Sequence, residues 1–386
     1  MGVSTAYFPT RHRFYDPAIH SISILEASGI AAGSSGKGGG FIASWATPKC
    51  IAPLSFDLHK RLAQEHGGDK TWGYRVVTAA EIELQARKEH AQGQQPEGFG
   101  RSPPVDAPAA LDWLCPKSIK AYREVGTPKD SGQVHPFLLT TKLAQLAAEK
   151  GVRIITGLAT AINYSEDGSK VRSVTYREQD ESHVLDATDV LVAAGPWSPK
   201  LLPQVKLQAP KGHSIVVKPS MDISPYILFT ETRTPATATP LMIDIYPRPP
   251  DPLNGFDSLY ASGPDHYDVP LPERASDTTV EPGKIDDVWK AVSSVVSREI
   301  REGGEVVTTQ ACYKAQIRKH TEGEEVGPMV GPVDEDNING LWLATGLDEW
   351  GIQNGPGVGL VVSEMILEGG KATSADVEPL NPKHWL

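Results

Sequence analysis

Ser21-Ile-Ser-Ile-Leu-Glu26, followed by Gly33-Ser-Ser-Gly-Lys-Gly-Gly-Gly40, is the stretch that decides the fold of this chain. The first segment predicts a short strand that ends in an acid, the position from which a carboxylate binds ribose hydroxyls in a dinucleotide-binding βαβ unit. Residues 1–8 are typical of the first turn of a nucleotide-binding helix, with Gly2 as the last glycine of a Gly-x-Gly-x-x-Gly turn. Because no strand precedes this helix, we expect a βαβ unit that lacks its first strand through a truncated start.

The glycine-rich run has five glycines in eight residues. Glycines let the backbone approach phosphates or a flat ring without a side-chain clash. The alternative is a flexible surface loop. Phe41-Ile-Ala-Ser-Trp45 follows the run and is apolar, so we expect the chain to return to the core there.

Composition excludes several classes of protein. With 386 residues and 39% hydrophobic content, the chain can bury a substantial core. A net charge of -11 argues against a nucleic-acid-binding surface. No apolar run is long enough for a membrane span, and no signal sequence is evident, so we expect a cytoplasmic protein. Cys50, Cys115 and Cys312 are too scattered for a disulfide framework or a zinc site, and no metal is expected.

Apolar periodicity predicts an α/β fold. The short apolar runs 22–25, 190–193 and 341–344 suit parallel strands buried on both faces, and they are expected to share one sheet. Residues 136–151 form a predicted helix, with Pro136 in the first turn and Gly151 as a left-handed cap. Residues 286–302 predict a second amphipathic helix.

The middle of the chain predicts antiparallel structure and two insertions. Residues 162–176, with Glu166-Asp-Gly168 at their centre, predict a hairpin. Residues 214–267 are rich in strand formers and predict an antiparallel sheet suited to a substrate domain. Two Pro-rich segments, residues 92–110 and 247–252, are expected to be irregular.

Two later segments also end strands in glycine. Val190-Leu-Val-Ala-Ala-Gly-Pro-Trp197 places Ala-Gly where a side chain would collide with a nucleotide, although an ordinary strand-to-turn glycine explains it equally. Residues 341–359 form a strand, a glycine turn and the start of a helix. We expect Asn354 or Pro356 to open this helix, which runs to Gly369. Its positive end suits the negative charge that a reduced flavin carries at its pyrimidine edge.

Taken in order, these segments resemble FAD-dependent oxidoreductases of the D-amino-acid oxidase superfamily. The likeness is strongest to glycine and sarcosine oxidase-like members and to uncharacterised fungal relatives, some of them linked to endosomes. The resemblance implies an α/β fold in which a Rossmann-like FAD-binding domain carries an inserted substrate domain of mixed or antiparallel sheet. It assigns residues 1–75, 134–202 and 325–386 to the FAD-binding domain, and residues 76–133 and 203–324 to the substrate domain.

The resemblance also implies the cofactor contacts and the reaction. The expected FAD-binding residues are Gly2, Glu26, Ala27, Ser35, Gly36, Lys37, Gly39, Gly40, Thr160, Ala161, Ala194, Gly195, Trp197, Gly346, Gly351, Ile352 and Gln353. In such enzymes the α-hydrogen of an amine or amino acid passes as hydride to flavin N5, and dioxygen reoxidises the flavin to give peroxide and an imine. No catalytic acid or base is assigned.

Lys314, Tyr313 and His213 are the candidate substrate-binding residues. Lys314 stands where relatives that oxidise amino acids resemble Leu-Arg-Pro, and an ammonium holds a carboxylate only as a point charge. An ordinary surface lysine and a structural histidine are the alternatives for Lys314 and His213. Leu347 replaces a histidine found in many relatives. Cys312 lies near the cysteine that attaches flavin in some sarcosine oxidase-like enzymes, but a buried thiol is the favoured reading.

Two classes of function remain open from the sequence. The first is an FAD-dependent amine or amino-acid oxidoreductase that uses a small-molecule substrate and dioxygen. The second is a non-enzymatic protein that keeps the fold for binding, in endosomal membrane trafficking. A nicotinamide enzyme is a weaker third reading, because the Trp350-Gly-Ile352 turn suits a flavin edge.

Overall fold

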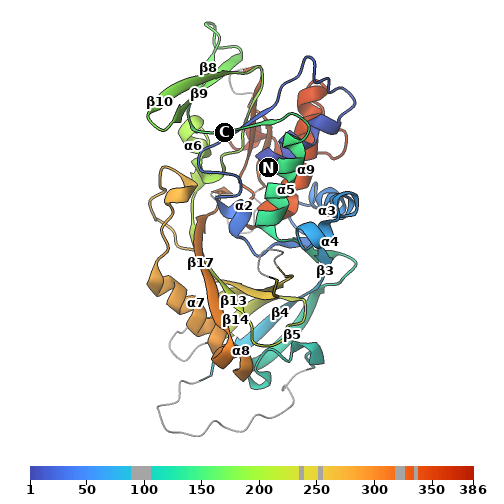
Figure 1. Cartoon of the computed structure of the whole chain (residues 1–386), viewed down its shortest axis with the longest axis vertical. Coiled ribbons are helices and arrows are strands. Elements are labelled where there is room, and N and C mark those ends of the chain that lie inside the picture. Colours follow the sequence, from blue (N-terminus) through green and yellow to red (C-terminus); the bar gives the residue numbers. More distant parts are fainter. Residues whose placement is uncertain (88–105, 234–238, 251–254, 318–326, 334–337) are drawn as a thin grey trace.

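The computed structural model describes residues 1–386 except 88–105, 234–238, 251–254, 318–326 and 334–337. Figure 1 shows the large sheet, with β13, β14, β4 and β5, in the lower part of the molecule. Helices α3, α5 and α9 and both chain termini lie above it. The described α-helices are α1 (Gly2–Tyr7), α2 (Ser34–Lys37), α3 (Ala52–His66), α4 (Gly68–Thr71), α5 (Pro136–Ala148), α6 (Ser198–Leu201), α7 (Pro282–Val295), α8 (Arg298–Gly303) and α9 (Gly351–Leu367).

Short 3-10 helices connect many of these elements. Their bounds are Pro9–Arg11, Ala109–Leu111, Pro116–Ser118, Gly195–Trp197, Ala275–Asp277, Asp348–Trp350, Glu378–Leu380 and Pro382–His384.

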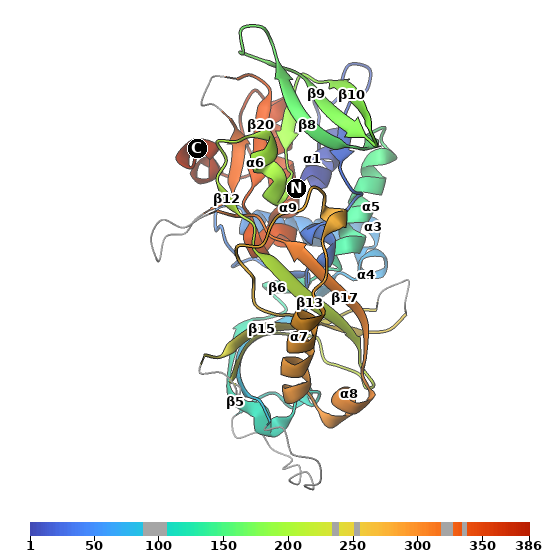
Figure 2. The ribbon, with the colours of Figure 1, turned by 90° about the vertical axis from the view of Figure 1, so that its left-hand side faces the viewer.

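The largest sheet has seven strands in the order β17-β13-β16-β15-β14-β4-β5. Its strands are β4 (Thr78–Gln85), β5 (Ile119–Gly126), β13 (Lys211–Lys218), β14 (Tyr226–Arg233), β15 (Leu241–Arg248), β16 (Ser258–Ser262) and β17 (Glu305–Tyr313). The antiparallel sheet predicted for residues 214–267 is therefore present, but the whole sheet is mixed because β4 joins β14 in parallel. Helix α7 covers one face, as Figure 2 shows.

Alternation along β15 explains how this sheet separates a core from a cavity. Successive side chains of a strand point to opposite faces. Ile243 and Ile245 pack in the core that contains the apolar residues of α7. Met242, Asp244 and Tyr246 point to the opposite face and line a cavity.

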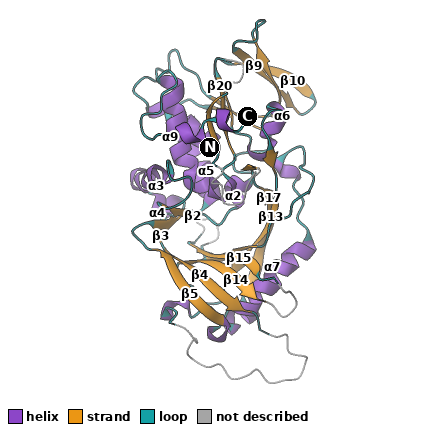
Figure 3. Ribbon diagram, turned by 180° about the vertical axis from the view of Figure 1, so that it is seen from behind, coloured by secondary structure: helices purple, strands orange, loops and turns teal. Residues whose placement is uncertain are grey.

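The smaller sheets lie mainly above the large one (Figure 3). They contain β1 (Ser23–Glu26) with β7 (Arg153–Thr156); β8 (Leu158–Tyr164), β9 (Val171–Glu178) and β10 (Glu181–Asp186); β11 (Val190–Val192), β20 (Leu341–Thr345) and β19 (Met329–Pro332); β2 (Phe41–Ala43), β6 (Ser131–Gln133) and β3 (Arg75–Val76); and β12 (Leu207–Gln208) with β18 (Gln316–Ile317). The predicted hairpin is confirmed as β8 and β9, with Gly168 at a φ of +73° in its turn.

The prediction that three strands share one sheet is wrong for β1. Strands β11 and β20 pair in parallel, but β1 pairs only with β7. No strand in the described part of the chain bridges β1 and β11. Both strands line the same cavity and are only partly buried, in contrast to the fully buried β20.

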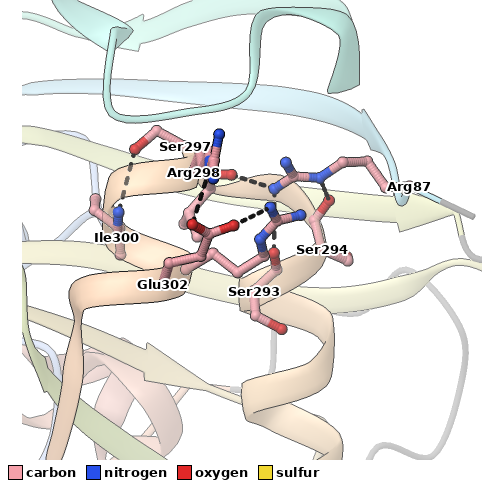
Figure 4. A network of polar contacts seen from close by, with 9 residues as sticks. Arg87, Ser293, Ser294, Ser297, Arg298, Ile300 and Glu302 are labelled. Atoms are coloured by element: carbon pink, nitrogen blue, oxygen red, sulfur yellow. Dashed lines mark hydrogen bonds and ion pairs between the residues drawn. The ribbon is translucent and has the colours of Figure 1, made fainter. Parts of the chain in front are cut away.

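The predicted helix over residues 286–302 is two helices. Val296 is extended and pairs with Leu114, so α7 ends at Val295. Ser297 then caps α8, its Oγ accepting from the Ile300 N–H at 3.4 Å. Figure 4 shows Arg87 beside this junction. Arg87 donates to the carbonyls of Ser293 and Ser294 in the last turn of α7, where carbonyls have no partner within the helix, and to the carbonyl of Val296 directly after it.

Two further expectations are corrected. Helix α9 begins at Gly351, not at Asn354 or Pro356, so Pro356 lies inside the helix. Strand β15 continues through Pro247 and Arg248, which were expected in an irregular insertion. Pro249 and Pro250 are irregular, as expected, whereas residues 251–252 and most of residues 92–110 lie outside the described residues. The predicted start of α5 at Pro136 is confirmed, and Gly151 adopts a φ of +93°.

Candidate functional site

A cavity of about 1590 Å³ connects the glycine-rich segments to the large sheet. Its lining includes residues of α1, β1, β11 and α9 and residues of β13 to β17. Pockets for small ligands have volumes of about 300–1,000 Å³. The cavity is therefore large enough for a dinucleotide together with a second, smaller molecule.

Glu26 lies at the end of β1 and lines this cavity. Its Oε1 accepts a hydrogen bond from the Ser28 N–H at 3.3 Å. Burial raises the pKa of Glu26, while backbone N–H groups of Ser28, Gly29 and Ala27 oppose the rise. The carboxyl group is positioned by the loop that follows the strand, as binding to a ribose hydroxyl requires.

Two cavity glycines have open space where a side chain would stand. A Cβ at Gly195 or at Gly351 would have no protein atom within 4 Å. Both residues line the cavity. A flat ring or a pyrophosphate could therefore lie directly against their backbone, which fits the expected dinucleotide.

Helix α9 directs its N-terminus at the same space. Gly351 and Ile352, the first two residues of the helix, line the cavity, and no side chain caps this end. The first N–H groups of a helix have no partner within it and carry partial positive charge. This end of α9 can therefore stabilise negative charge on a bound ring system.

The structure brings most of the predicted site residues together. The predicted residues that line the cavity are Gly2, Glu26, Ala27, Ser35, Gly39, Gly40, Ala194, Gly195, Trp197, Gly351, Ile352, Lys314 and His213. The predicted residues outside its lining are Gly36, Lys37, Thr160, Ala161, Gly346, Gln353 and Tyr313. The residues of the second group are near neighbours of lining residues. Their own side chains, or the Cβ positions of the glycines, contact other protein atoms or point away from the cavity.

Gln353 illustrates this second group. Its Oε1 accepts from the Ala43 N–H at 2.8 Å and its Nε2 donates to the Ala52 carbonyl at 3.0 Å, so it ties α9 to β2 and α3. A Cβ at Gly346 would lie 2.7 Å from the Ile317 side chain. Tyr313 donates from its hydroxyl to the Pro270 carbonyl at 2.7 Å. Gln353, Gly346 and Tyr313 therefore pack behind the residues that line the cavity.

The side chains of Lys37 and Thr160 also form hydrogen bonds within the protein. Lys37 Nζ donates to the Ala311 carbonyl at 3.0 Å, which joins α2 to β17. Thr160 Oγ1 donates to the Thr175 carbonyl at 3.2 Å in the β8–β9 pair.

Lys314 is paired with two carboxylates at the large-sheet end of the cavity. Its Nζ lies 2.6 Å from Asp265 Oδ2 and 3.1 Å from Glu349 Oε1. Burial alone would lower the pKa of Lys314, but Glu349 and Asp265 outweigh burial and raise it. Lys314 is therefore a permanent cation that already has two carboxylate partners.

Asp244 is a cavity residue that the sequence reasoning missed. Burial raises its pKa to about 7, the charge of Glu349 adds to the rise, and Lys314 opposes it. The available signal was the charge of Asp244 within the otherwise apolar alternation of residues 241–247. A polar residue at a strand position that should be buried indicates either a partner or a function.

An aromatic wall lies beside Asp244 and was also missed. It consists of Phe41, Phe229, Tyr246, Tyr260 and Trp350, all of which line the cavity. The distance between ring centroids is 5.4 Å for Phe41 and Phe229, 5.9 Å for Phe229 and Tyr246, and 6.2 Å for Phe41 and Trp350. A Cβ at Gly39 would lie 1.9 Å from Tyr246, so glycine is required for the wall to meet the glycine-rich run.

His213 and Cys312 also line this end of the cavity. His213 is 1% exposed, and its Nε2 accepts from the Glu281 N–H at 3.3 Å. Burial and the charge of Lys211 lower the pKa of His213. Burial raises the pKa of the Cys312 thiol to about 11, which makes it a weak nucleophile.

Among the described residues, no group of three His, Cys, Asp or Glu side chains is placed to hold a metal ion. None of the described helices is long and apolar enough to cross a membrane. None of the three cysteines forms a disulfide.

Comparison with known proteins gives consistent matches over nearly the whole chain. A family model described as FAD dependent oxidoreductase matches residues 1–365. The chain is 29% identical to a "putative oxidoreductase" of Schizosaccharomyces pombe, covering 100% of this chain and 96% of that protein. It is 25% identical to a "putative oxidoreductase" of Saccharomyces cerevisiae, covering 100% of this chain and 93% of the relative.

Two solved structures show the same fold. Glycine oxidase from Bacillus cereus superposes with a TM-score of 0.69 at 20% identity, covering 96% of this chain and 92% of the other. L-proline dehydrogenase from P. horikoshii gives a TM-score of 0.68 at 16% identity, covering 98% and 93% of the two chains. The mixed α/β architecture described above is therefore the fold of these proteins.

Proposed function

This chain belongs to the family of FAD-dependent oxidoreductases, and on that premise we propose that it oxidises an amine or an amino acid, with dioxygen as the final oxidant. FAD is the cofactor of the family, and when bound it supplies the hydride acceptor, flavin N5, and the site at which dioxygen is reduced. The residues of this chain supply the positioning and the electrostatic environment.

The observation that carries the proposal is the continuity of one cavity. Glu26, Gly195 and Gly351 line one part of it, and Asp244 and Lys314 line another. A cofactor held by the first group and a small molecule held by the second would occupy the same cavity. Oxidation by hydride transfer requires such direct contact between the two molecules.

We assign the cofactor contacts within this proposal as follows. Glu26 would accept hydrogen bonds from the ribose, while Ser35, Gly39 and Gly40 would lie along the pyrophosphate and the flavin. The backbone from Ala194 to Trp197 would border the nucleotide. The N-terminus of α9, at Gly351 and Ile352, would face the pyrimidine edge of the flavin, where a helix end stabilises negative charge.

The division into an FAD-binding domain and a substrate domain belongs to the same proposal. Strands β4, β5 and β13 to β17 of the large sheet lie within residues 76–133 and 203–324. Digestion with a protease at low concentration tests these boundaries.

The proposal also includes a cytoplasmic location with peripheral endosomal association. Fluorescence microscopy of the tagged chain tests this location.

The first experiment is an absorption spectrum of the purified chain before and after incubation with FAD and gel filtration. We expect flavin bands at roughly 370 and 450 nm in the protein fraction. Peroxide release is then measured with a peroxidase-coupled assay over a panel of amines and amino acids. The control is the same protein incubated with riboflavin, which lacks the adenosine that Glu26 would bind.

Two results would count against the proposal. Failure of the folded protein to retain FAD would contradict the cofactor assignment and favour the non-enzymatic binding protein. The second result is a protein that retains FAD but whose flavin band at about 450 nm does not decrease when any amine or amino acid is added in the absence of oxygen. This result would contradict the substrate class.

A further inference from the structure

We propose that the large-sheet end of the cavity binds a cationic amine that carries no carboxylate, with its ammonium group at Asp244 and its apolar body against the aromatic wall. This inference rests on the proposed amine-oxidising function and narrows its substrate class. It also gives Asp244 a role as the acceptor of the proton that the ammonium group must lose.

The first step of the argument is that Lys314 is unsuited to bind a substrate carboxylate. Its Nζ already contacts Asp265 Oδ2 at 2.6 Å and Glu349 Oε1 at 3.1 Å. Two carboxylates around one ammonium leave a local charge of about -1 before any ligand arrives. An incoming carboxylate would have to displace one of them and would meet repulsion from the other.

The second step is the charge of the surrounding wall. Besides Asp265 and Glu349, the cavity lining at this end contains Asp244 and Asp348. Asp348 Oδ2 accepts from Gln316 Nε2 at 3.0 Å, whereas its buried Oδ1 has no hydrogen-bond partner. Among the described residues, the strands of the large sheet and residues 347–350 contribute no lysine or arginine to the lining, and Lys314, directly after β17, is the cation beside them. The net charge therefore favours a cation.

The third step is the placement of Asp244 beside aromatic rings. Asp244 and Tyr246 occupy alternate positions of β15 and thus share the cavity face of the strand. The Tyr246 ring lies 6.0 Å from Tyr260 and 5.9 Å from Phe229. Aromatic faces attract cations and pack against apolar groups. A carboxylate within such a wall is suited to an ammonium group attached to a hydrocarbon.

The fourth step concerns the proton. An ammonium nitrogen has no free electron pair, so a hydride can leave its α-carbon only after one N–H proton has gone. Asp244 can take this proton: the N–H bond breaks, its electron pair remains on nitrogen, and an O–H bond forms on the carboxylate. Burial raises the pKa of Asp244 to about 7, so that its carboxylate is a stronger base than an exposed one.

Binding of two inert probes to the FAD-loaded protein tests the inference. Phenyltrimethylammonium and benzoate have similar apolar bodies and opposite charges, and the change in flavin absorption on titration reports binding of each. We expect the cation to bind at least about tenfold more tightly than benzoate. Tighter binding of benzoate would overturn the inference.

Substitutions identify the residues responsible. Asp244→Asn should weaken phenyltrimethylammonium binding by about tenfold, because the amide keeps the shape and removes the charge. Glu349→Gln changes an exposed side chain and provides a second variant if Asp244→Asn fails to fold. Glu349→Gln should weaken the binding of phenyltrimethylammonium. It should strengthen the binding of benzoate, because Lys314 loses one of its carboxylate partners. The matched control is Glu83→Gln, an exposed carboxylate on β4 outside the cavity lining.

Reduction of the flavin by benzylamine in the absence of oxygen tests the proton step separately. Asp244→Asn should slow reduction at saturating benzylamine by at least about tenfold. Equal reduction rates in the variant and the natural protein would overturn the role of Asp244 as base. Failure of the protein to bind FAD would instead contradict the proposed function, so the two failures are distinguishable.

Discussion

His59 Nε2 lies 3.0 Å from the carbonyl oxygen of Ile352, at the point where Pro356 leaves the hydrogen-bond ladder of α9 without a donor. A helical carbonyl normally accepts from the N–H four residues later, and proline has none. His59, on α3, supplies the missing donor, and it also lies 3.2 Å from the Gln353 carbonyl. Ser55 Oγ accepts from the Gly357 N–H at 2.9 Å on the same interface. Helix α3 thus completes the first turns of α9.

The first prediction is that His59 makes stability depend on pH. Burial lowers the pKa of His59 from 6.5 to about 4, and the hydrogen bonds to Ile352 and Gln353 only partly oppose this. The unfolded chain therefore binds a proton at His59 more readily than the folded chain. The resulting stabilisation is fully present above pH 6.5 and is lost as the pH falls from 6.5 to about 4. The shift corresponds to about 3 kcal/mol.

Urea unfolding between about pH 7.5 and 3.5, a window that contains both His59 pKa values, measures this dependence. His59→Gln keeps a neutral N–H donor and should lose less stability across that window. Equal losses in the two proteins would contradict the assignment to His59.

The second prediction concerns the contact between α1 and α9. A Cβ at Gly359 would lie 2.4 Å from Ser4 Cβ and 2.6 Å from the Ser4 carbonyl carbon. Gly359→Ala should therefore push α1 away from α9 and reduce the free energy of unfolding by about 1–3 kcal/mol. Gly283→Ala is the control, because Gly283 lies in α7 with no protein atom within 4 Å of its Cβ position. The control should stabilise the protein slightly through helix propensity, and destabilisation of both variants alike would argue against a specific helix contact.

The third prediction separates cofactor binding from folding at Gly351. Its Cβ position is open and its φ of -63° suits any residue, so Gly351→Ala should not destabilise the protein without FAD. The added methyl group would occupy space proposed for the flavin. We expect FAD affinity to fall by about tenfold, measured by quenching of flavin fluorescence. Unchanged affinity would place the flavin away from the N-terminus of α9.

The fourth prediction concerns Arg87, whose guanidinium closes the end of α7 (Figure 4). Its Nε donates to the Ser294 carbonyl at 3.0 Å and its Nη2 to the Ser293 carbonyl at 3.2 Å, with a further bond to the Val296 carbonyl. Arg87→Ala should cost about 1–3 kcal/mol because it removes the side-chain donors to these carbonyls. Hydrogen exchange should accelerate at the end of α7. Arg298→Ala removes an exposed pair with Glu302 and should have little effect on that exchange.

Local elements were predictable because their signals lie within a few residues. The start of α5 at Pro136, the β8–β9 hairpin and the strand ending at Glu26 all follow from short-range patterns. The break between α7 and α8 was not predictable, because Val296 leaves the helix to pair with Leu114, which is distant in the sequence. The start of α9 was misplaced for the same reason: proline is common in the first turn of a helix, and inside α9 the donor that Pro356 lacks is supplied by His59 from the distant helix α3.

The sequence by itself determined the family and the order of the glycine-rich segments, and it singled out Glu26, Gly195 and Gly351, since each of these residues belongs to a short local motif. Only the tertiary structure decided the chemical character of the substrate end. From the sequence, Lys314 was either a substrate-binding residue or an ordinary surface lysine, but the fold pairs it with Asp265 and Glu349 and sets Asp244 among aromatic rings. The physical reason is that the charge a ligand meets is the sum over all neighbouring groups, and those neighbours come from strands that are adjacent in the sheet and distant in the chain.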